Sequence, residues 1–136
     1  MKEKQKTDDF ESRYRILVSW MQLRDWNRTL ARYFEDNNYK KVAIYGIGIL
    51  GELFLEEAKR MNLGIDYAID RCAGERTFGN IPIRTMDEER FEEVDVIIVT
   101  PIQIFESIEQ DLSKKTEADI VSLEDIVLYV AEEAEC

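Results

Sequence analysis

The sequence predicts an α/β fold, a three-layer sandwich around a five-stranded parallel sheet with its strands in the order 3-2-1-4-5. From Lys41 onward, short apolar runs alternate with segments of helical period. The apolar runs, of which VIIV is the clearest, lack polar alternation, as expected of parallel strands that are covered on both faces. Because crossover connections between parallel strands are right-handed, this alternation favours the stated strand order.

Residues 1–39 are predicted to form a helical extension in front of a sheet domain at 40–136. One apolar face comprises Phe10, Tyr14, Leu17 and Met21, and a second comprises Trp26, Leu30, Tyr33 and Phe34. These faces predict two helices, or one helix bent near Arg24-Asp25, that end at Asn37-Asn38. The faces would either cover the sheet or form a homodimer interface through the N-terminal helices, since aromatic residues are enriched in interfaces.

Strands and helices alternate through the predicted sheet domain. The strands are expected at 41–45, 64–70, 81–84, 94–100 and 118–123. The helix after the first strand has an apolar stripe at Leu50, Leu53, Phe54, Ala58 and Met61, with Glu52, Glu56 and Glu57 on its solvated face. Further helices are expected to begin at the capping box Thr85-Met86-Asp87-Glu88, at Thr100-Pro101, and at Ser122 with Asp125.

A G-x-G-x-x-G series follows the first predicted strand, in the form Gly46-Ile47-Gly48-Ile49-Leu50-Gly51. It stands between a strand and a helix inside a βαβ unit, which is the context of a dinucleotide-binding turn. Gly46 allows a tight turn, Gly48 lets a pyrophosphate approach the backbone, and Gly51 lets the helix pack close to the strand. The first N–H groups of the helix would bind the phosphates. We therefore expect a Rossmann-like nucleotide site over residues 46–51.

An acid closes the second predicted strand, where a dinucleotide would place its ribose. Asp70 follows Gly51 by 19 residues and is placed to accept a hydrogen bond from a 2′-hydroxyl. A solvated loop acid, or a cap for the following turn, is the other interpretation. Arg71 is of the type that binds a 2′-phosphate, unless it faces solvent, so the pattern fits NAD or NADP. Thr100 and Pro101 border the crevice expected beyond the strand ends, although capping alone would also explain them.

The loop at 71–80 carries Gly74, Phe78 and Gly79. It would either fold over an adenine or serve as an ordinary connection between strands. A site for S-adenosylmethionine is disfavoured, because Ile44 occupies the position, two residues before the first glycine, where such sites usually have an acid.

The runs IYGIGILGE, IDYAIDRCAGERTFGNIPIRTMDE and VDVIIVTP resemble the nucleotide-binding domain that precedes the catalytic part of polysaccharide-biosynthesis nucleotide-sugar dehydratases and epimerases. The likeness includes the short strand at Gly79-Asn80-Ile81-Pro82-Ile83. The chain is also similar to small stand-alone proteins of bacterial capsule and glycan gene clusters, which have a W-x-x-L preface. The resemblance covers 40–125 well and 10–39 loosely, and it implies a bound nucleotide in glycan assembly. Arg71-Cys72 departs from it, because several acids often follow the second strand in those domains.

The charge of the chain disfavours several classes of partner. The net charge is −11, with nine Lys/Arg against seven Asp/Glu in residues 1–40 and nine against twenty-two in residues 41–136. A domain this acidic is repelled by nucleic-acid phosphates and by anionic membrane surfaces. No apolar run approaches the ~20 residues that cross a bilayer. The N-terminus MKEKQKTDDFE lacks the apolar core of a signal peptide, so we expect a cytoplasmic protein.

Catalytic equipment is sparse in this sequence. There is no histidine, and the two cysteines, Cys72 and Cys136, make neither a disulfide framework nor a metal cluster. Dehydratases and epimerases of the short-chain type need a Tyr-x-x-x-Lys pair, in which the lysine lowers the tyrosine pKa, and no such pair occurs. Cys72 lies beside the expected crevice but has no histidine to activate it. We expect no catalytic residue and no metal ligand.

Three functions remain open on these grounds. The first is a small accessory or regulatory module of polysaccharide or nucleotide-sugar metabolism that binds NAD(P)(H) and forms an oligomer. The second is a nucleotide-sugar oxidoreductase or dehydratase component whose active site a partner subunit completes, with ligand contacts from Trp20, Trp26 or Tyr33. In both, the ligand is a dinucleotide or a nucleotide-sugar. The third is a scaffold without a ligand, its crevice closed by Ile47, Ile49 or Phe78.

Overall fold

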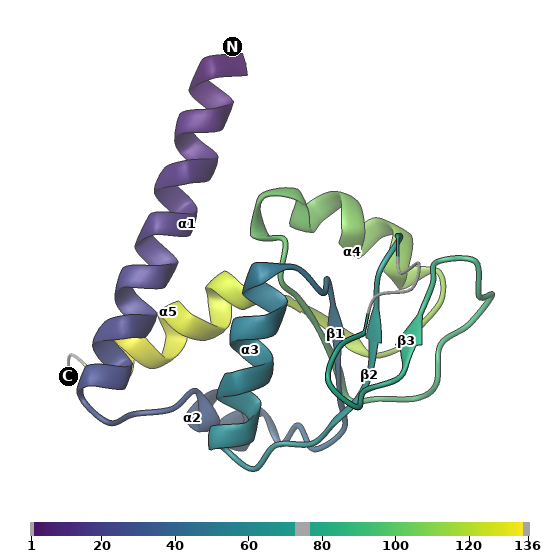
Figure 1. Cartoon of the computed structure of the whole chain (residues 1–136). Helices are drawn as coiled ribbons and strands as arrows, with labels where there is room; N and C mark the ends of the chain where they lie inside the picture. The colour runs from purple at the N-terminus through teal and green to yellow at the C-terminus, as the bar shows by residue number, and fades with distance from the viewer. Residues whose placement is uncertain (1, 73–76, 135–136) are drawn as a thin grey trace.

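The computed structural model describes residues 2–72 and 77–134, with side chains from Phe10 onward. Five parallel strands form one sheet in the order β3-β2-β1-β4-β5, with helices packed on it (Figure 1). The strands are β1 (Val42–Tyr45), β2 (Ile65–Ile69), β3 (Ile83–Arg84), β4 (Val96–Val99) and β5 (Asp119–Ser122). The predicted α/β fold and strand order are therefore confirmed.

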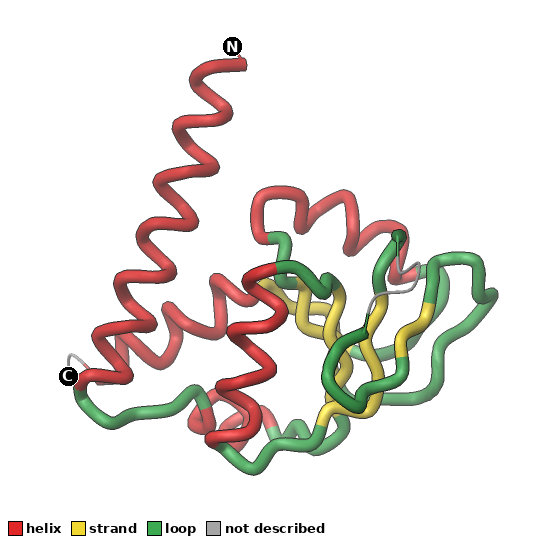
Figure 2. The backbone as a smooth tube through the Cα atoms, in the orientation of Figure 1, coloured by secondary structure: helices red, strands yellow, loops and turns green. Residues whose placement is uncertain are grey.

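Five α-helices and one 3-10 helix accompany the strands (Figure 2) in the described residues. They are α1 (Lys2–Asp25), α2 (Ala31–Asn37), α3 (Ile49–Arg60), η1 (Ile102–Ile104), α4 (Phe105–Ser113) and α5 (Leu123–Ala134). The N-terminal extension is thus two helices that end at Asn37, and Asn38 takes a left-handed conformation with φ of 57° as the C-cap. None of the described helices combines the length and the apolar character that crossing a membrane would require.

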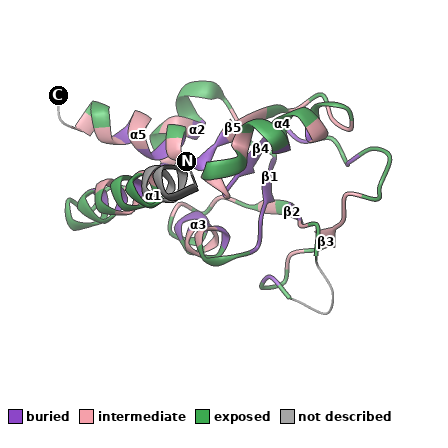
Figure 3. Ribbon diagram, turned by 90° about the horizontal axis from the view of Figure 1, so that it is seen from above, coloured by how far each residue is buried: buried purple, intermediate pink, exposed green. Residues whose placement is uncertain are grey.

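The centre of the sheet is fully buried. Val42 of β1 pairs with Ile65 of β2 on one side and with Val96 of β4 on the other. Every residue of β1 and β4 is buried, which explains why these runs show no polar alternation. The two strands lie between the helical layers (Figure 3).

Each face of the sheet has its own core. One core combines the sheet with α1, α2, α3 and α5; its largest fully buried side chains include Ile16, Leu23, Leu30, Ile44, Phe54, Ile98 and Leu123. The opposite core lies under α4 and residues 85–95, and contains Ala43, Tyr45, Tyr67, Ile69, Phe91, Val94, Ile97, Val99, Ile108 and Leu112. Residues of the N-terminal helices thus share a core with the sheet.

The prediction of a helix that begins at Thr85 is wrong. Residues 85–95 form turns and irregular chain, and the Glu88 N–H donates to the Thr85 carbonyl at 3.4 Å as in a turn. Five of the seven residues from Asp87 to Glu93 are acidic. Their mutual repulsion disfavours a helix, and Met86, Phe91 and Val94 are too few apolar residues to form a helical stripe against the sheet.

Lys115, in the connection between α4 and β5, binds the backbone of this irregular segment. Its Nζ donates to the carbonyls of Met86 at 2.9 Å and Glu88 at 2.7 Å, and its own carbonyl accepts the Phe91 N–H at 3.1 Å. The Phe91 ring stacks on Tyr67 with centroids 6.2 Å apart. The segment therefore covers the sheet with side chains and satisfies its backbone through a lysine.

Helix α1 has two apolar faces, and only one of them packs inward. Ile16, Trp20 and Leu23 are buried against the body of the protein. The face predicted to hold Phe10, Tyr14, Leu17 and Met21 instead leaves Phe10 66%, Tyr14 63% and Met21 68% exposed. The N-terminal half of α1 extends away from the rest of the chain (Figures 1 and 2).

Glu57 of α3 is the buried polar link between this extension and the sheet domain. Its side chain is 1% exposed. The indole N–H of Trp20 donates to Oε1 at 3.1 Å, and the backbone N–H of Leu30 donates to Oε2 at 2.9 Å. The assignment of Glu57 to a solvated face is therefore wrong. Its carboxylate joins α1, the start of α2 and α3 in the interior.

Candidate functional site: a crevice at the glycine turn

The glycine series after β1 needs glycine at two positions, one in the turn and one in the first turn of α3. Gly46 has φ of +100°, and a Cβ there would lie 2.5 Å from Thr100 Oγ1 and 2.8 Å from Pro101 Cδ. A Cβ on Gly51 would lie 2.1 Å from the carbonyl oxygen of Gly46. These two glycines therefore serve the packing of α3 against the strand ends, as the sequence predicts.

Gly48 is different, because no neighbour in the described part of the chain occupies the space of a side chain at this position. A Cβ there would meet no atom within 4 Å, and its φ of −81° suits any residue. Gly48 is the N-cap of α3, and none of the described side chains makes a capping hydrogen bond there. The first helical bond runs from the Glu52 N–H to the Gly48 carbonyl, so the N–H groups of residues 49–51 have no partner within the helix.

A crevice of about 490 Å³ lies beside this turn. Its lining combines the turn, the ends of β2 and β4, and one side of α1, through Arg13, Leu17, Gly46, Gly48, Ile49, Leu50, Asp70, Thr100, Pro101 and Gln103. Most of the predicted site residues are thus brought together, whereas Ile47, Gly51 and Arg71 do not line the crevice. Arg13, Leu17 and Gln103 were missed, because only the tertiary packing of α1 and η1 brings them to the turn.

Asp70 lies at the edge of the crevice with its carboxylate turned toward the glycine turn. Oδ2 accepts the N–H of Ile47 at 3.2 Å, and Oδ1 accepts the N–H of Cys72 at 2.8 Å. The interpretation of Asp70 as a cap for the following turn is therefore confirmed. The same carboxylate holds the glycine turn and remains part of the crevice lining.

Arg71 turns away from the crevice toward α4. Its Nε donates to the hydroxyl of Tyr45 at 3.2 Å, and a terminal nitrogen donates to Asp111 Oδ2 at 2.6 Å. The hydrogen bond with Tyr45, followed by the charge of Asp111, raises the pKa of the Arg71 guanidinium. Arg71 therefore links the chain after β2 to Tyr45 of β1 and Asp111 of α4.

Thr100 and Pro101 line the crevice without capping a helix. The Thr100 hydroxyl is within donating distance of the Tyr45 carbonyl at 2.9 Å and the Gly46 carbonyl at 3.2 Å. Pro101 precedes the short helix η1, and α4 begins only at Phe105. The predicted N-cap at Thr100 is therefore wrong, since this buried hydroxyl instead ties the end of β4 to the glycine turn. The cap predicted at Ser122 is confirmed, because Ser122 Oγ accepts the Glu124 N–H at 3.2 Å.

The bulky side chains around the turn leave the crevice open. Ile47 and Phe78 are 4% and 2% exposed and belong to the core beneath the turn. Ile49 is 78% exposed at the mouth of the crevice. Gly74 lies outside the described residues, and the packing of Phe78 in the core removes it from any role over an adenine.

No family model, curated protein or solved structure matches this chain. The crevice itself therefore carries the functional argument.

The other residues considered for chemistry lie away from the crevice lining. Cys72 is an exposed free thiol. The indole N–H of Trp20 donates to Glu57, and Trp26 is 44% exposed. Tyr33 packs edge-on against Phe34 and Tyr129. Within the described residues, no three acidic or cysteine side chains are grouped to hold a metal ion.

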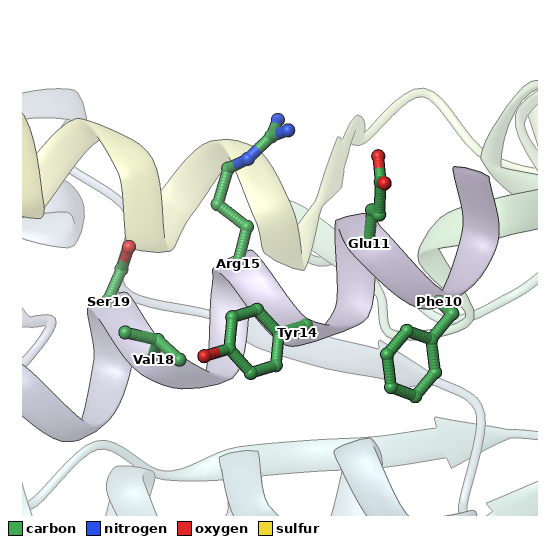
Figure 4. Close-up of a pocket in the computed structure, with 6 residues that line it drawn as sticks. All are labelled: Phe10, Glu11, Tyr14, Arg15, Val18 and Ser19. Carbon is green, nitrogen blue, oxygen red and sulfur yellow. The ribbon is translucent and has the colours of Figure 1, made fainter. Parts of the chain in front are cut away.

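A second surface runs along the outer side of α1. Phe10 stacks on Tyr14 with ring centroids 6.5 Å apart, and a shallow hollow of about 390 Å³ lies beside them, lined in the described residues by α1. Its lining residues are Phe10, Glu11, Tyr14, Arg15, Val18 and Ser19 (Figure 4). We call Phe10, Tyr14, Val18 and Met21, each at least 46% exposed, the outer stripe of α1.

Proposed function

We propose that the crevice binds a nucleotide, in the form of NAD(H) or a nucleotide-sugar, and that the protein is a small nucleotide-binding module. The observation that carries this is the open space over Gly48, where the chain has no steric need for glycine. A pyrophosphate placed there would meet bare backbone and the free N–H groups of residues 49–51. The positive end of the α3 dipole would add to its binding.

The residues beyond the turn favour NAD(H) over NADP(H). The Asp70 carboxylate suits the hydroxyls of a ribose and would repel a 2′-phosphate. Arg71, the basic residue nearest to that position in sequence, is held by Tyr45 and Asp111 and does not line the crevice. We accordingly propose an unmodified 2′-hydroxyl on the bound ribose.

The place of this module in metabolism rests on the sequence resemblance of residues 40–125. We propose an accessory or regulatory protein of bacterial polysaccharide or nucleotide-sugar metabolism that works in the cytoplasm. The crevice of about 490 Å³ can enclose a large part of a dinucleotide, and the remainder would extend past the exposed Ile49.

A homodimer through α1 is the proposed assembly. The outer stripe of α1, Phe10, Tyr14, Val18 and Met21, has residues four, four and three positions apart, which places them on one face of the helix that a second copy could cover. The projecting half of an unsupported helix is marginal in water, so burying this stripe against a second copy would stabilise it. Pairing through α1 also keeps the acidic residues 41–136 of the two copies apart.

Titration calorimetry with NAD+, NADH, NADP+ and nucleotide-sugars tests the binding proposal. Gly48→Ala should fold with unchanged stability and bind the preferred ligand at least tenfold more weakly, because its methyl group would occupy the pyrophosphate position. Gly64→Ala is the matched control, since a Cβ there also meets no atom within 4 Å and Gly64 does not line the crevice. Absence of heat with every ligand, or equal affinity for the Gly48→Ala variant, would refute the proposal.

A further inference from the structure

We propose that Arg13 of α1 binds a phosphate of the nucleotide, so that the N-terminal helix forms part of the ligand site. This inference rests on the proposed nucleotide binding and deepens it. Arg13 and Leu17, one helical turn apart, line the same crevice as Gly46 and Gly48. The phosphate would then lie between the free N–H groups of α3 on one side and the Arg13 guanidinium on the other.

The charges around the crevice give Arg13 this role. Among the lining residues in the described part of the chain, Arg13 is the only cation and Asp70 the only anion. The protein carries a net charge of −11, so a ligand with two phosphate charges approaches against repulsion. Backbone N–H groups supply hydrogen bonds but only partial charge, whereas a guanidinium adds a full charge and a planar fork that matches two phosphate oxygens.

The packing of α1 fixes the direction in which Arg13 extends. Ile16, Trp20 and Leu23 are buried at helical spacing, which sets the rotation of α1 against the body. The bond from Trp20 to the buried Glu57 secures that rotation. Arg13 is thereby placed on the flank of α1 that faces the glycine turn, and Arg15 lines the outer hollow of the same helix.

This pair of arginines gives a matched experiment. Arg13→Ala and Arg15→Ala remove the same charge from exposed positions two residues apart. Calorimetry with NAD+ should show Arg13→Ala binding about 10- to 100-fold more weakly, as expected for a charge-assisted hydrogen bond of ~1.5–3 kcal/mol. Arg15→Ala should bind within twofold of the wild type. The Arg13→Lys variant keeps the charge but not the planar fork, so its affinity for NAD+ should lie between those of the Arg13→Ala and Arg15→Ala variants.

Salt separates an ionic contact from an effect on packing. If Arg13 binds phosphate, the loss caused by Arg13→Ala should shrink as NaCl rises from 50 to 500 mM, because screening weakens the contact in the wild type. A salt-independent loss would assign Arg13 to the packing of α1 and overturn the inference. Equal affinity of Arg13→Ala and wild type for NAD+ would overturn it while leaving nucleotide binding intact. Failure of the wild type to bind any nucleotide would remove both proposals.

Discussion

Replacing Glu57 by glutamine should loosen the attachment of the N-terminal helices. The substitution keeps the shape of the side chain but turns one acceptor oxygen into an amide donor. Both oxygens are in use: Oε1 accepts from Trp20 at 3.1 Å and Oε2 from the Leu30 N–H at 2.9 Å. One of these two donors would then face another donor inside the protein, where water cannot replace the lost acceptor.

The expected loss follows from these contacts. A buried donor left without a partner costs about 1–3 kcal/mol. Arg60 and Arg24 approach Oε1 at 3.4 and 3.9 Å, and because both are partly exposed their pairing adds at most about 1 kcal/mol. Glu57→Gln should therefore lower the free energy of unfolding by about 2–4 kcal/mol, a large part of the ~5–15 kcal/mol typical of a domain.

Urea unfolding followed by tryptophan fluorescence measures this loss directly. Glu56→Gln is the control, because it makes the same change of charge one residue away. The Glu56 side chain is 62% exposed and pairs with Lys59 on the surface of α3. It should shift stability by less than about 0.5 kcal/mol. Trp20→Phe removes the indole donor, so in a double-mutant cycle it should couple to Glu57→Gln by about 1 kcal/mol or more. A Glu57→Gln protein as stable as the Glu56→Gln protein would refute the reasoning.

Three further outcomes are expected. Gly51→Ala should cost more than about 2 kcal/mol of unfolding free energy in the same urea assay, because its Cβ would lie 2.1 Å from a backbone oxygen, and Gly64→Ala should be neutral. Met21→Asp in the outer stripe should convert the proposed dimer to monomer in sedimentation velocity without lowering the melting temperature of the body; an unchanged sedimentation coefficient would contradict the proposed interface. Burial, with nearby acids, raises the pKa of Tyr67 to about 12 from 10.0, so its stabilising contribution is complete below pH 10 and lost as the pH rises toward 12. Tyr67→Phe should therefore flatten the decline of the melting temperature between pH 10 and 12, and an equally steep decline would show that Tyr67 is not responsible.

The sheet and the glycine turn could be predicted because their causes are local in the sequence. Unbroken apolar runs at 42–45 and 96–99 belong to strands buried on both faces, and the spacing of Gly46 and Gly51 reflects the approach of one helix to one strand end. Each pattern needs only the residues next to it. The order of the strands then followed from the handedness of the connections.

The remaining features depend on residues distant in the chain. The position of Glu57 along α3 predicts a solvated residue. It is buried because Trp20 and Leu30, which are distant in sequence, pack over it and donate to its carboxylate. Thr100 has the sequence of an N-cap, but the carbonyls of Tyr45 and Gly46 compete for its hydroxyl. Arg13 lines the crevice because of the angle at which α1 packs on the body, and the spacing of residues along α1 does not predict that angle.

Because residues 85–95 form no regular helix, the β3 edge of the sheet should open locally more easily than the rest of the sheet. β3 has only two residues, and it is joined to β4 by an irregular segment whose backbone makes three hydrogen bonds with Lys115. Amide exchange should therefore begin at this edge, well before the central strands β1 and β4. Because the backbone carbonyl of Arg84 in β3 accepts the N–H of Asp70, such opening would release the Asp70 backbone at one rim of the crevice. For the proposed nucleotide, this opening of the edge strand is a route into and out of the crevice that leaves the central strands folded.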